Sequence, residues 1–409
     1  MGAQARRTHP DGKHTGEAAG YANRRPALRA SPHVGAPRVQ PMRTGLPGFG
    51  RFVCDTGQVR RPVHTLPKAH LHLHFTGSMR FTTLLEMAEE QRVRLPRALV
   101  EDWPPALAAR DERGWFRFQR LYDAARSCVR SESAMRRIVA EAAEDDAAEG
   151  SRWLELQVDP TSYAPFVGGL TPALEIVLDE ARRVSSAGPV GVGVVVAASR
   201  IRHPLDARTL ARLAARYAGD GPGEVVGFGL SNDERRGHIE EFEGAFRIAR
   251  RADLAIVPHG GELLGPEAVH ATLEAARPDR IGHGVRSVEN SEVLADVVSR
   301  GVTLEVCPGS NVGLGVYATP FDVPLRPLYD AGAQIALGAD DPLLFGSRLA
   351  DQYEIARSVH AFDDDALADL ARMSIRGSRA PQSVKDDALV DIDTWLRTPG
   401  EPRTDTSPG

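Results

Sequence analysis

The chain has 409 residues, of which 42% are hydrophobic and 26% are charged, and its formal net charge is −5 at pH 7. This composition is typical of a soluble globular protein, and no apolar run reaches the ~18 residues that a membrane span needs. The small net charge argues against nucleic acid or a membrane surface as a partner, so we expect a small-molecule substrate. Cys54, Cys128 and Cys307 form no CxxC pair, which argues against disulfides or a thiolate zinc site and favours a reducing cytoplasm.

The two ends of the chain differ in composition from the rest. Residues 1–62 are rich in Arg, Gly, Pro and Ala and lack apolar periodicity, which predicts a disordered leader. They lack the apolar core of a signal peptide and contain more Pro and Gly than most transit peptides. A dispensable leader, or a start codon assigned too early, is the simpler interpretation. Residues 398–409 are predicted to be a disordered tail, which leaves residues 63–397 as the folded domain.

Short apolar runs alternate with amphipathic helical stretches from Val63 onwards, as in successive βα units. Eight runs are predicted strands: Ala69–Phe75, Trp153–Pro160, Val190–Ser199, Val225–Asp233, Leu254–Glu262, Arg280–Val285, Thr303–Asn311 and Ile335–Pro342. Eight such units predict an α/β fold with a closed parallel (β/α)8 barrel, the TIM barrel. A doubly wound open sheet is the alternative, but no GxGxxG motif follows the first strand.

A long helical insertion separates the first two predicted strands. It runs from Phe81 to Glu149 and contains Trp115, Phe116, Phe118 and Tyr122. Insertions of this length in a barrel often cover its mouth, so we expect a lid.

Histidines alternate with apolar residues in the first predicted strand. His70, His72 and His74 interleave with leucine and phenylalanine, which predicts one apolar face and one imidazole face. Two imidazoles at i and i+2 point to the same side and can reach one cation. A lone HxH is weak evidence, but this strand must be buried if it belongs to a parallel barrel.

Polar residues also end three later strands. His259 and Glu262 lie in HGGE, His283 lies between two glycines, and Asp340 and Asp341 precede a proline. Each alone is explained equally well by a capped turn or a hydrogen-bonded histidine. In a barrel, however, the carboxyl ends of all strands meet at one face, so we expect these side chains to converge.

The residue types at these strand ends suit metal-assisted hydrolysis. Neutral imidazoles with one carboxylate favour zinc and leave a position for water. Zinc lowers the pKa of such a water towards neutrality. Glu262 could donate a proton to the group under attack, if burial raises its pKa. These residues by themselves name no substrate.

Five motifs resemble those of the adenosine deaminase family. PKAHLHLHFTG, PHGGE, RIGHGVR, EVCPGSN and LGADDPLLF occur in the order and approximate spacing of that family, from about Pro67 to Phe345, with weaker likeness to Trp395. The H-x-E…P-C-x-x-C signature of the other zinc deaminases is absent from the sequence.

The resemblance implies a set of residue roles. One zinc ion per chain would be bound by His72, His74, His259 and Asp340. Glu262 would protonate the purine at N1 while hydroxide adds to C6, and His283 would orient the water and help to deprotonate it. Asp341 would hold that water and hydrogen-bond N7, after which ammonia leaves. Thr76, Asn232, Gly261 and Asp341 are the expected substrate contacts.

The sequence departs from the family on the sugar side of the site. Thr76 stands where the family has an Asp that binds the 5′ side of the ribose. Gln157 replaces an Arg, Gly229 replaces an Asp, and Asn232 replaces the Gly whose amide contacts purine N3. A neutral Thr76 removes the cost of an unpaired carboxylate and is expected to open space beside Gly77 for a 5′ substituent.

The resemblance therefore predicts hydrolytic deamination of an adenine nucleoside, with ammonia release, in the cytoplasm. Its partners would be a purine nucleoside and water, without nucleic acid or membrane. Adenosine competes as substrate with 5′-modified relatives such as 6-aminodeoxyfutalosine of menaquinone biosynthesis. Two further functions compete with deamination: hydrolysis of an ester or amide by the same metal barrel, and nucleoside binding without catalysis.

Overall fold

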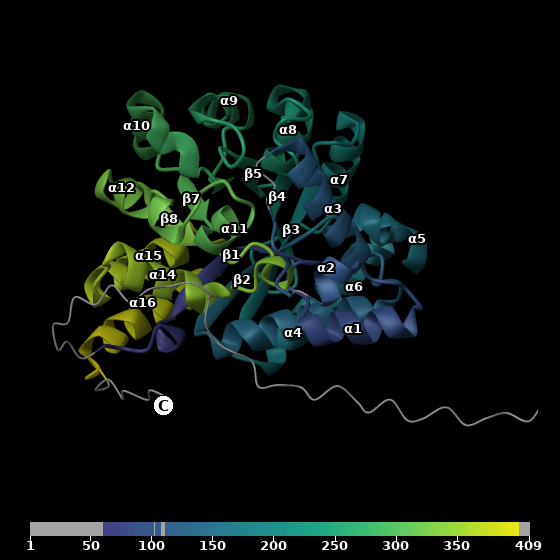
Figure 1. Ribbon diagram of the computed structural model, residues 1–409, viewed down its shortest axis with the longest axis horizontal. Helices are drawn as coiled ribbons and strands as arrows, with labels where there is room; N and C mark the ends of the chain where they lie inside the picture. The colour runs from purple at the N-terminus through teal and green to yellow at the C-terminus, as the bar shows by residue number, and fades with distance from the viewer. Residues whose placement is uncertain (1–59, 102, 108–110, 401–409) are drawn as a thin grey trace, which may run out of the picture. The chain divides into compact units, whose positions relative to one another are not determined.

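A computed structural model of the chain describes residues 60–101, 103–107 and 111–400 (Figure 1). The predictions for residues 1–59 and 401–409 lie outside this part of the chain. Within it, no helix is long and apolar enough to cross a membrane.

Eight parallel strands form the barrel that the sequence predicts, and each strand pairs with the next in chain order. The strands are β1 Lys68–His74, β2 Ser151–Val158, β3 Gly191–Ser199, β4 Val225–Ser231, β5 Ala255–Gly260, β6 Arg280–His283, β7 Thr303–Val306 and β8 Gln334–Leu337. A parallel bridge between Leu73 and Asp340 joins β1 to the end of β8. The sheet therefore closes as predicted, and the alternative of an open doubly wound sheet is excluded.

Helices surround the strands (Figure 1). The α-helices are α1 Phe81–Glu90, α2 Arg97–Val100, α3 Glu112–Arg126, α4 Glu132–Ala148, α5 Ala164–Val167, α6 Leu170–Ala187, α7 Pro204–Arg216, α8 Glu243–Arg251, α9 Pro266–Ala276, α10 Ser291–Ser299, α11 Pro308–Gly313, α12 Leu325–Asp330, α13 Pro342–Phe345, α14 Leu349–His360, α15 Asp364–Gly377 and α16 Gln382–Arg397. The 3₁₀ helices are η1 Val63–Thr65, η2 Pro160–Ser162, η3 Ile239–Phe242, η4 Val285–Glu289 and η5 Pro320–Asp322.

Several strands end earlier than the sequence predicts. The run Thr303–Asn311 is predicted as one strand, but β7 ends at Val306 and α11 begins at Pro308. Proline is favoured in the first turn of a helix because it has no N–H to leave unpaired there. The polar ends of the apolar runs therefore lie beyond the hydrogen-bonded sheet, in the loops that build the site.

The predicted imidazole face of β1 is interrupted. The pairing of β1 with β2 shifts between His70 and Leu73, as at a β-bulge. Because one extra residue reverses the side-chain alternation, His70 contacts Asp146 of α4, whereas His72 and His74 reach the barrel mouth. The prediction that all three histidines share one face is wrong for His70.

The insertion between β1 and β2 divides into two parts. Trp115, Phe118 and Tyr122 of α3 line a cavity at the barrel mouth, as expected of a lid, and Phe118 stacks on Phe345 with ring centroids 6.0 Å apart. Phe116 is instead exposed and lies under the guanidinium of Arg236. The last helix, α4, packs on β2 and α6 as an ordinary barrel helix.

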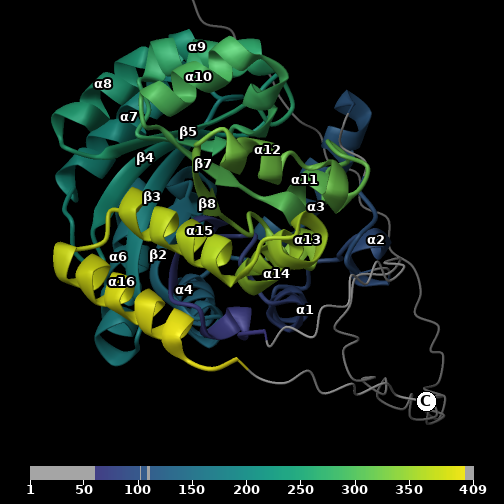
Figure 2. The same cartoon turned by 90° about the vertical axis from the view of Figure 1, so that its left-hand side faces the viewer.

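Buried charged side chains fill the interior of the barrel towards the N-terminal ends of its strands. Arg280, the first residue of β6, pairs with Glu155 of β2 and Glu305 of β7. The segment between α15 and α16 closes this end, since Gly377 O accepts from Arg280 and the N–H of Arg379 donates to Glu155. Figure 2 shows α15 and α16 side by side.

The packed domain begins slightly before residue 63 and extends past 397. Arg61 forms an ion pair with Asp364 at 2.8 Å and donates to the carbonyl oxygens of Leu396 and Thr398. The two ends of the described chain are therefore tied together beside α16.

Candidate active site

The four predicted metal ligands come together at the C-terminal end of the barrel. They are His72 and His74 of β1, His259 of β5, and Asp340, which follows β8. The Nε2 atoms of His72 and His74 lie 3.4 and 3.1 Å from Asp340 Oδ1. One ligand atom from each of the three histidines lies within 4.8 Å of the other two. This spacing suits ligands of a common cation.

Asp340 is positioned by its backbone and by a serine. Its N–H donates to His72 O and its carbonyl accepts from the N–H of His74, each at 3.0 Å. Its φ of 62° is left-handed, a conformation that few residues other than Gly, Asn and Asp adopt. Ser310 Oγ donates to Oδ2 at 2.5 Å, which leaves Oδ1 facing the histidines.

A buried carboxylate orients the imidazole ring of His72. Glu305 Oε2 accepts a hydrogen bond from His72 Nδ1 at 2.7 Å, and neither side chain is exposed. Burial raises the pKa of Glu305, but Arg280 and His72 outweigh it and hold the pKa below its usual value. An ionised Glu305 fixes the proton of His72 on Nδ1, so the lone pair of Nε2 points at the metal position.

The buried nitrogen atoms of this cluster fit a bound cation. His72 Nε2 and His259 Nε2 are buried and have no hydrogen-bond partner among the described residues. Without metal, burial lowers the pKa of His72, but the carboxylates of Asp340 and Glu305 outweigh it and raise the pKa to about 10. Metal binding at this point would therefore release a proton. Burial also keeps the pKa of His259 well below its usual value, so that this imidazole is a neutral ligand.

Glu262 follows β5, and His283 ends β6 with its ring 4.8 Å from that of His72 and 5.0 Å from that of His259. Glu262 Oε2 is 3.6 Å from His283 Nε2, and both side chains are buried. Burial raises the pKa of Glu262 well above its usual value, and the charges of Asp340 and Glu234 raise it further. Burial and the neighbouring His72 lower the pKa of His283 to about 3. The pair therefore supplies one protonated acid and one neutral imidazole.

Asp341 and Thr76 occupy the β1 side of the cavity. A Cβ on Gly77 would lie 1.8 Å from Asp341 Oδ1, so the glycine leaves room for that carboxylate. The expectation of open space beside Gly77 is therefore wrong. Thr76 is buried and its hydroxyl is 2.5 Å from the hydroxyl of Tyr163. Burial and Asp340 raise the pKa of Asp341 well above its usual value.

The HGGE turn is organised by Glu234, a residue that the sequence motifs did not single out. Glu234 accepts hydrogen bonds from four successive backbone N–H groups, of residues 261–264, at 2.6–3.0 Å. Gly261 has a left-handed φ of 68° and does not line the cavity, so it serves the turn and gives its N–H to Glu234. Asn232 does line the cavity and has a left-handed φ of 83°, which explains why Asn can replace Gly there. Glu234 ends the segment GLSNDE, residues 229–234, and this segment was the sequence signal that could have identified it.

The cavity has a volume of about 200 Å³ and extends well beyond the catalytic groups. Besides three of the predicted metal ligands, His74, His259 and Asp340, and the predicted catalytic residues, its wall contains polar side chains of three other strands or their ends: Gln157 of β2, Ser199 of β3 and Asn232 after β4. The aromatic side of α3 covers it, and Arg126 and Arg202 lie at its rim. The arc β2–β4 therefore continues the cavity wall from β1, since Gln157 pairs in register with His74.

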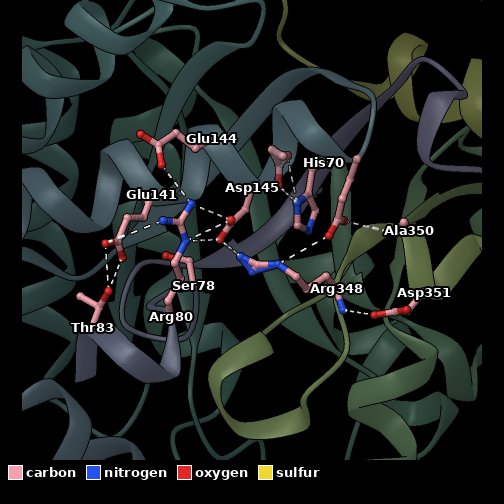
Figure 3. A network of polar contacts seen from close by, with 12 residues as sticks. His70, Ser78, Arg80, Thr83, Glu141, Glu144, Asp145, Arg348, Ala350 and Asp351 are labelled. Atoms are coloured by element: carbon pink, nitrogen blue, oxygen red, sulfur yellow. Dashed lines mark hydrogen bonds and ion pairs between the residues drawn. The ribbon is translucent and has the colours of Figure 1, made fainter. Parts of the chain in front are cut away.

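A polar network behind β1 ties together the loops that carry the ligands (Figure 3). Asp145 of α4 pairs with Arg80, which precedes α1, and with Arg348, which precedes α14. Beside it, His70 Nδ1 contacts Asp146 Oδ1 at 2.9 Å, and His70 Nε2 accepts from the N–H of Ala339 at 3.0 Å. Ala339 immediately precedes Asp340, so this network holds the backbone of a metal ligand.

A closed parallel barrel with histidines, carboxylates and a buried acid at the strand ends fits a metal-dependent hydrolase. The chain belongs to the adenosine deaminase family, whose sequence profile matches residues 67–395. It is thus a deaminase of a family that hydrolyses adenine-type substrates, as the resemblance predicts.

Similar proteins cover almost the whole folded part. A Streptomyces virginiae relative, whose name of adenosine/adenine deaminase leaves two substrates open, is 61% identical over 336 residues, which is 82% of this chain and 98% of the relative. The adenine deaminase of Mesorhizobium japonicum is 33% identical, with 81% and 99% covered. The crystal structure of adenine deaminase from Arthrobacter aurescens has a TM-score of 0.74 at 27% identity, with 81% and 99% covered.

Two further solved structures contain ligands. The Arabidopsis protein ADAL, complexed with IMP, has a TM-score of 0.71 at 25% identity and covers 81% of this chain and 97% of its own. An amidohydrolase from Burkholderia ambifaria with bound zinc shares the fold, with a TM-score of 0.72 at 23% identity and 82% and 93% covered.

Proposed function

We propose that this protein hydrolyses the C6 amino group of an adenine nucleoside and releases ammonia. One zinc ion per chain is held by His72, His74, His259 and Asp340, whose donor atoms face one another at the barrel mouth. The observation that carries the nucleoside assignment is the cavity, which continues from the catalytic groups into a second polar end on the β2–β4 arc.

The residues around the metal position supply the proton transfers. Zinc, when bound, supplies a water of lowered pKa. His283, neutral because burial lowers its pKa, accepts a proton from the attacking water. Glu262, protonated because burial raises its pKa, donates to purine N1 as the C6–O bond forms. The C6–N bond then breaks as the amino group takes the proton that His283 accepted and leaves as ammonia. The C6 hydroxyl returns its proton to Glu262 and becomes a carbonyl.

Asp341 and Asn232 orient the base. Asp341 Oδ1 is buried without a partner among the described residues, and its carboxyl lines the cavity beside Asp340. Because burial raises its pKa, the protonated carboxyl group of Asp341 donates a hydrogen bond to N7 of the purine, and it also holds the attacking water. The backbone at Asn232, in the position of the family's glycine, meets the N3 side, while Gly261 acts through the turn that carries Glu262.

The 5′ side of the nucleoside meets an uncharged surface. The hydroxyl of Thr76 is shared with Tyr163, and Tyr122 lines the same wall. A neutral wall of this kind does not require a 5′ hydroxyl to satisfy a buried charge. We therefore expect 5′-modified adenosines, 6-aminodeoxyfutalosine among them, to be substrates. Asp341 fills the space beside Gly77, so the substituent would extend into the cavity that Tyr122 and Tyr163 line.

Free adenine is the second candidate substrate, because several relatives are named adenine deaminases. A site built for the free base needs no polar groups beyond the purine. The second polar end of the cavity favours the nucleoside. The cytoplasmic location stays a prediction.

Ammonia release tests this function directly. We expect the zinc-loaded protein to deaminate adenosine or a 5′-modified adenosine with a kcat/KM at least about tenfold above that for adenine, equivalent to ~1.4 kcal/mol in the transition state. Adenine as the better substrate would overturn the nucleoside assignment and leave the deaminase chemistry. Absence of ammonia from every adenine compound would overturn the chemistry itself. For the 5′ side, 5′-deoxyadenosine and methylthioadenosine should react about as well as adenosine, and Thr76→Asp should reject them.

A further inference from the structure

Two buried polar side chains on the β2–β4 side of the cavity have no protein partner. Both amide atoms of Gln157 and the hydroxyl of Ser199 lack a hydrogen-bond partner among the described residues. Gln157 is 2% exposed and Ser199 is 9% exposed, and both line the cavity. Buried polar groups are almost always hydrogen-bonded, since leaving them unpaired costs about 1–3 kcal/mol each.

The strand register places these two groups in one subsite. Gln157 pairs with His74 on one side and with Val195 on the other. Ala197 and Ser199 follow on the same inward face of β3, because side chains alternate along a strand. Ala197 also lines the cavity, and its partner on β4 is Gly229. Ala197 therefore contributes only a methyl group to the cavity wall beside the two polar groups, which leaves room for a ligand there. Gly229 opens no further space, because a Cβ at this position would lie 3.0 Å from Val257 O.

The position of this subsite indicates which part of a substrate it meets. The predicted metal ligands and catalytic groups lie on or directly after β1, β5, β6 and β8. Gln157 lies on β2, next to β1, and Ser199 lies one strand further away, on β3. A purine that presents C6 to the metal has its N9 substituent on the far side. The subsite is therefore suited to the group attached at N9.

We propose that Gln157 and Ser199 bind the ribose hydroxyls of the substrate, an inference that rests on the proposed nucleoside deamination. The Gln157 amide offers one acceptor and two donors, and the Ser199 hydroxyl both donates and accepts. Groups that both donate and accept hydrogen bonds complement hydroxyls, which also donate and accept, better than they complement an anion, which only accepts. At the rim Arg126 and Arg202 are balanced by Asp123 and Asp159, so the surrounding charge does not select an anion.

Substrate analogues and matched variants test this subsite. In the unmodified enzyme, 2′-deoxyadenosine, 3′-deoxyadenosine or both should lose about 10–100-fold in kcat/KM against adenosine. In Gln157→Leu and Ser199→Ala, adenosine should lose a comparable factor, and the discrimination against the deoxy compounds should shrink. Adenine, which has no sugar, should react with each variant as it does with the wild type, or remain unreactive with all of them.

Controls separate binding from folding. Gln382→Leu makes the same substitution at an exposed site on α16 and should leave every ratio unchanged. Zinc content and melting temperature show whether Gln157→Leu folds. If it does not fold, the test rests on Ser199→Ala and on the comparison of adenosine with its deoxy analogues in the wild type. Equal kcat/KM for adenosine and both deoxy compounds in the wild type, within about threefold, would overturn the proposal while the deaminase function stands. Absence of ammonia from all compounds would instead defeat the function on which it rests.

Discussion

At the scale of single residues, environment assigns different roles to groups of the same type. Glu262, Asp340 and Asp341 are all buried carboxyls within one site, yet the pKa of Asp340 is low and the pKa values of Glu262 and Asp341 are high. Burial alone would raise all three. Asp340 differs because the imidazoles of His72 and His74 lie against it. It is therefore the charged group suited to metal, and Glu262 is the group suited to carry a proton.

Removal of one imidazole should cost both metal and activity. We expect His74→Ala to lose zinc and turnover together, because its Nε2 lies with Asp340 Oδ1 in the ligand cluster. Elemental analysis of the purified variant measures the zinc. His64→Ala, at an exposed histidine of η1, is the control and should keep both. Full zinc occupancy in His74→Ala would remove this residue from the ligand set.

Acid and metal functions should separate at Glu262. Glu262→Gln should keep zinc and lose about 10²–10⁴-fold in kcat, because an amide cannot deliver the proton. Glu267→Gln, on the exposed side of α9, is the matched control. Turnover of Glu262→Gln within about threefold of the wild type would mean that another group protonates the ring.

The raised pKa of Glu262 also predicts a pH dependence of stability. The folded state holds its proton to higher pH than the unfolded state does, so the free energy of unfolding falls as pH rises above the usual carboxyl pKa. The loss is at most about 1.4 kcal/mol per pH unit and stops at the folded pKa. We therefore expect a pH-dependent difference between Glu262→Gln and the wild type after a chelator has removed the metal from both. The free energy of unfolding of the variant, measured by denaturant titration, should rise relative to that of the wild type from about pH 5 to about pH 8. A constant difference across that range would show that Glu262 ionises normally.

At the scale of elements, the site depends on how β8 meets β1. The metal ligand Asp340 lies outside β8 and is joined to β1 through its own backbone. His70, which the bulge in β1 directs towards α4, accepts the N–H of Ala339 and contacts Asp146. Three elements far apart in sequence thus fix one ligand.

Loss of the His70 contact should loosen Asp340. His70→Leu should weaken zinc binding and lower kcat, whereas His70→Gln should restore both in part, because its amide can accept from Ala339 and donate to Asp146. Competition with a chelator measures the zinc affinity. His270→Leu, at an exposed histidine of α9, is the control. A lower melting temperature with unchanged zinc affinity in His70→Leu would show a purely structural role.

At the scale of the whole molecule, one barrel carries every group that the proposed reaction uses. All eight strands, the lid helix and the cavity lie within residues 60–400. The insertion between β1 and β2 has two roles. Its helix α3 covers the mouth of the barrel, and its helix α4 packs on the sheet.

Removal of residues 1–59 should leave folding and turnover intact, because the eight strands, the bridge that closes the barrel and the residues that line the cavity all lie within residues 60–400. Arg61 must be kept, since it ties the start of the domain to Asp364 and to the residues after α16. Melting temperature and kcat/KM of the truncated chain are the measurements. Insolubility or loss of activity would show that the leader packs on the domain.

The sequence by itself determined the barrel, its family and the candidate metal and catalytic residues. Apolar runs punctuated by polar strand ends repeat eight times, and in a parallel barrel topology alone brings those ends to one face. The resemblance to the family then singled out His72, His74, His259 and Asp340 among these strand ends as the expected metal ligands.

Only the tertiary structure decided the contacts that orient these side chains. A one-residue bulge turned His70 away from its neighbours, and Asp341 took the space beside Gly77. Glu234, Glu305 and the unpartnered Gln157 gained their significance from groups that lie far away in the chain. Periodicity reports which face a side chain occupies, but register shifts, hydrogen-bond partners and unfilled space arise from pairs of distant segments, and a local pattern does not contain them.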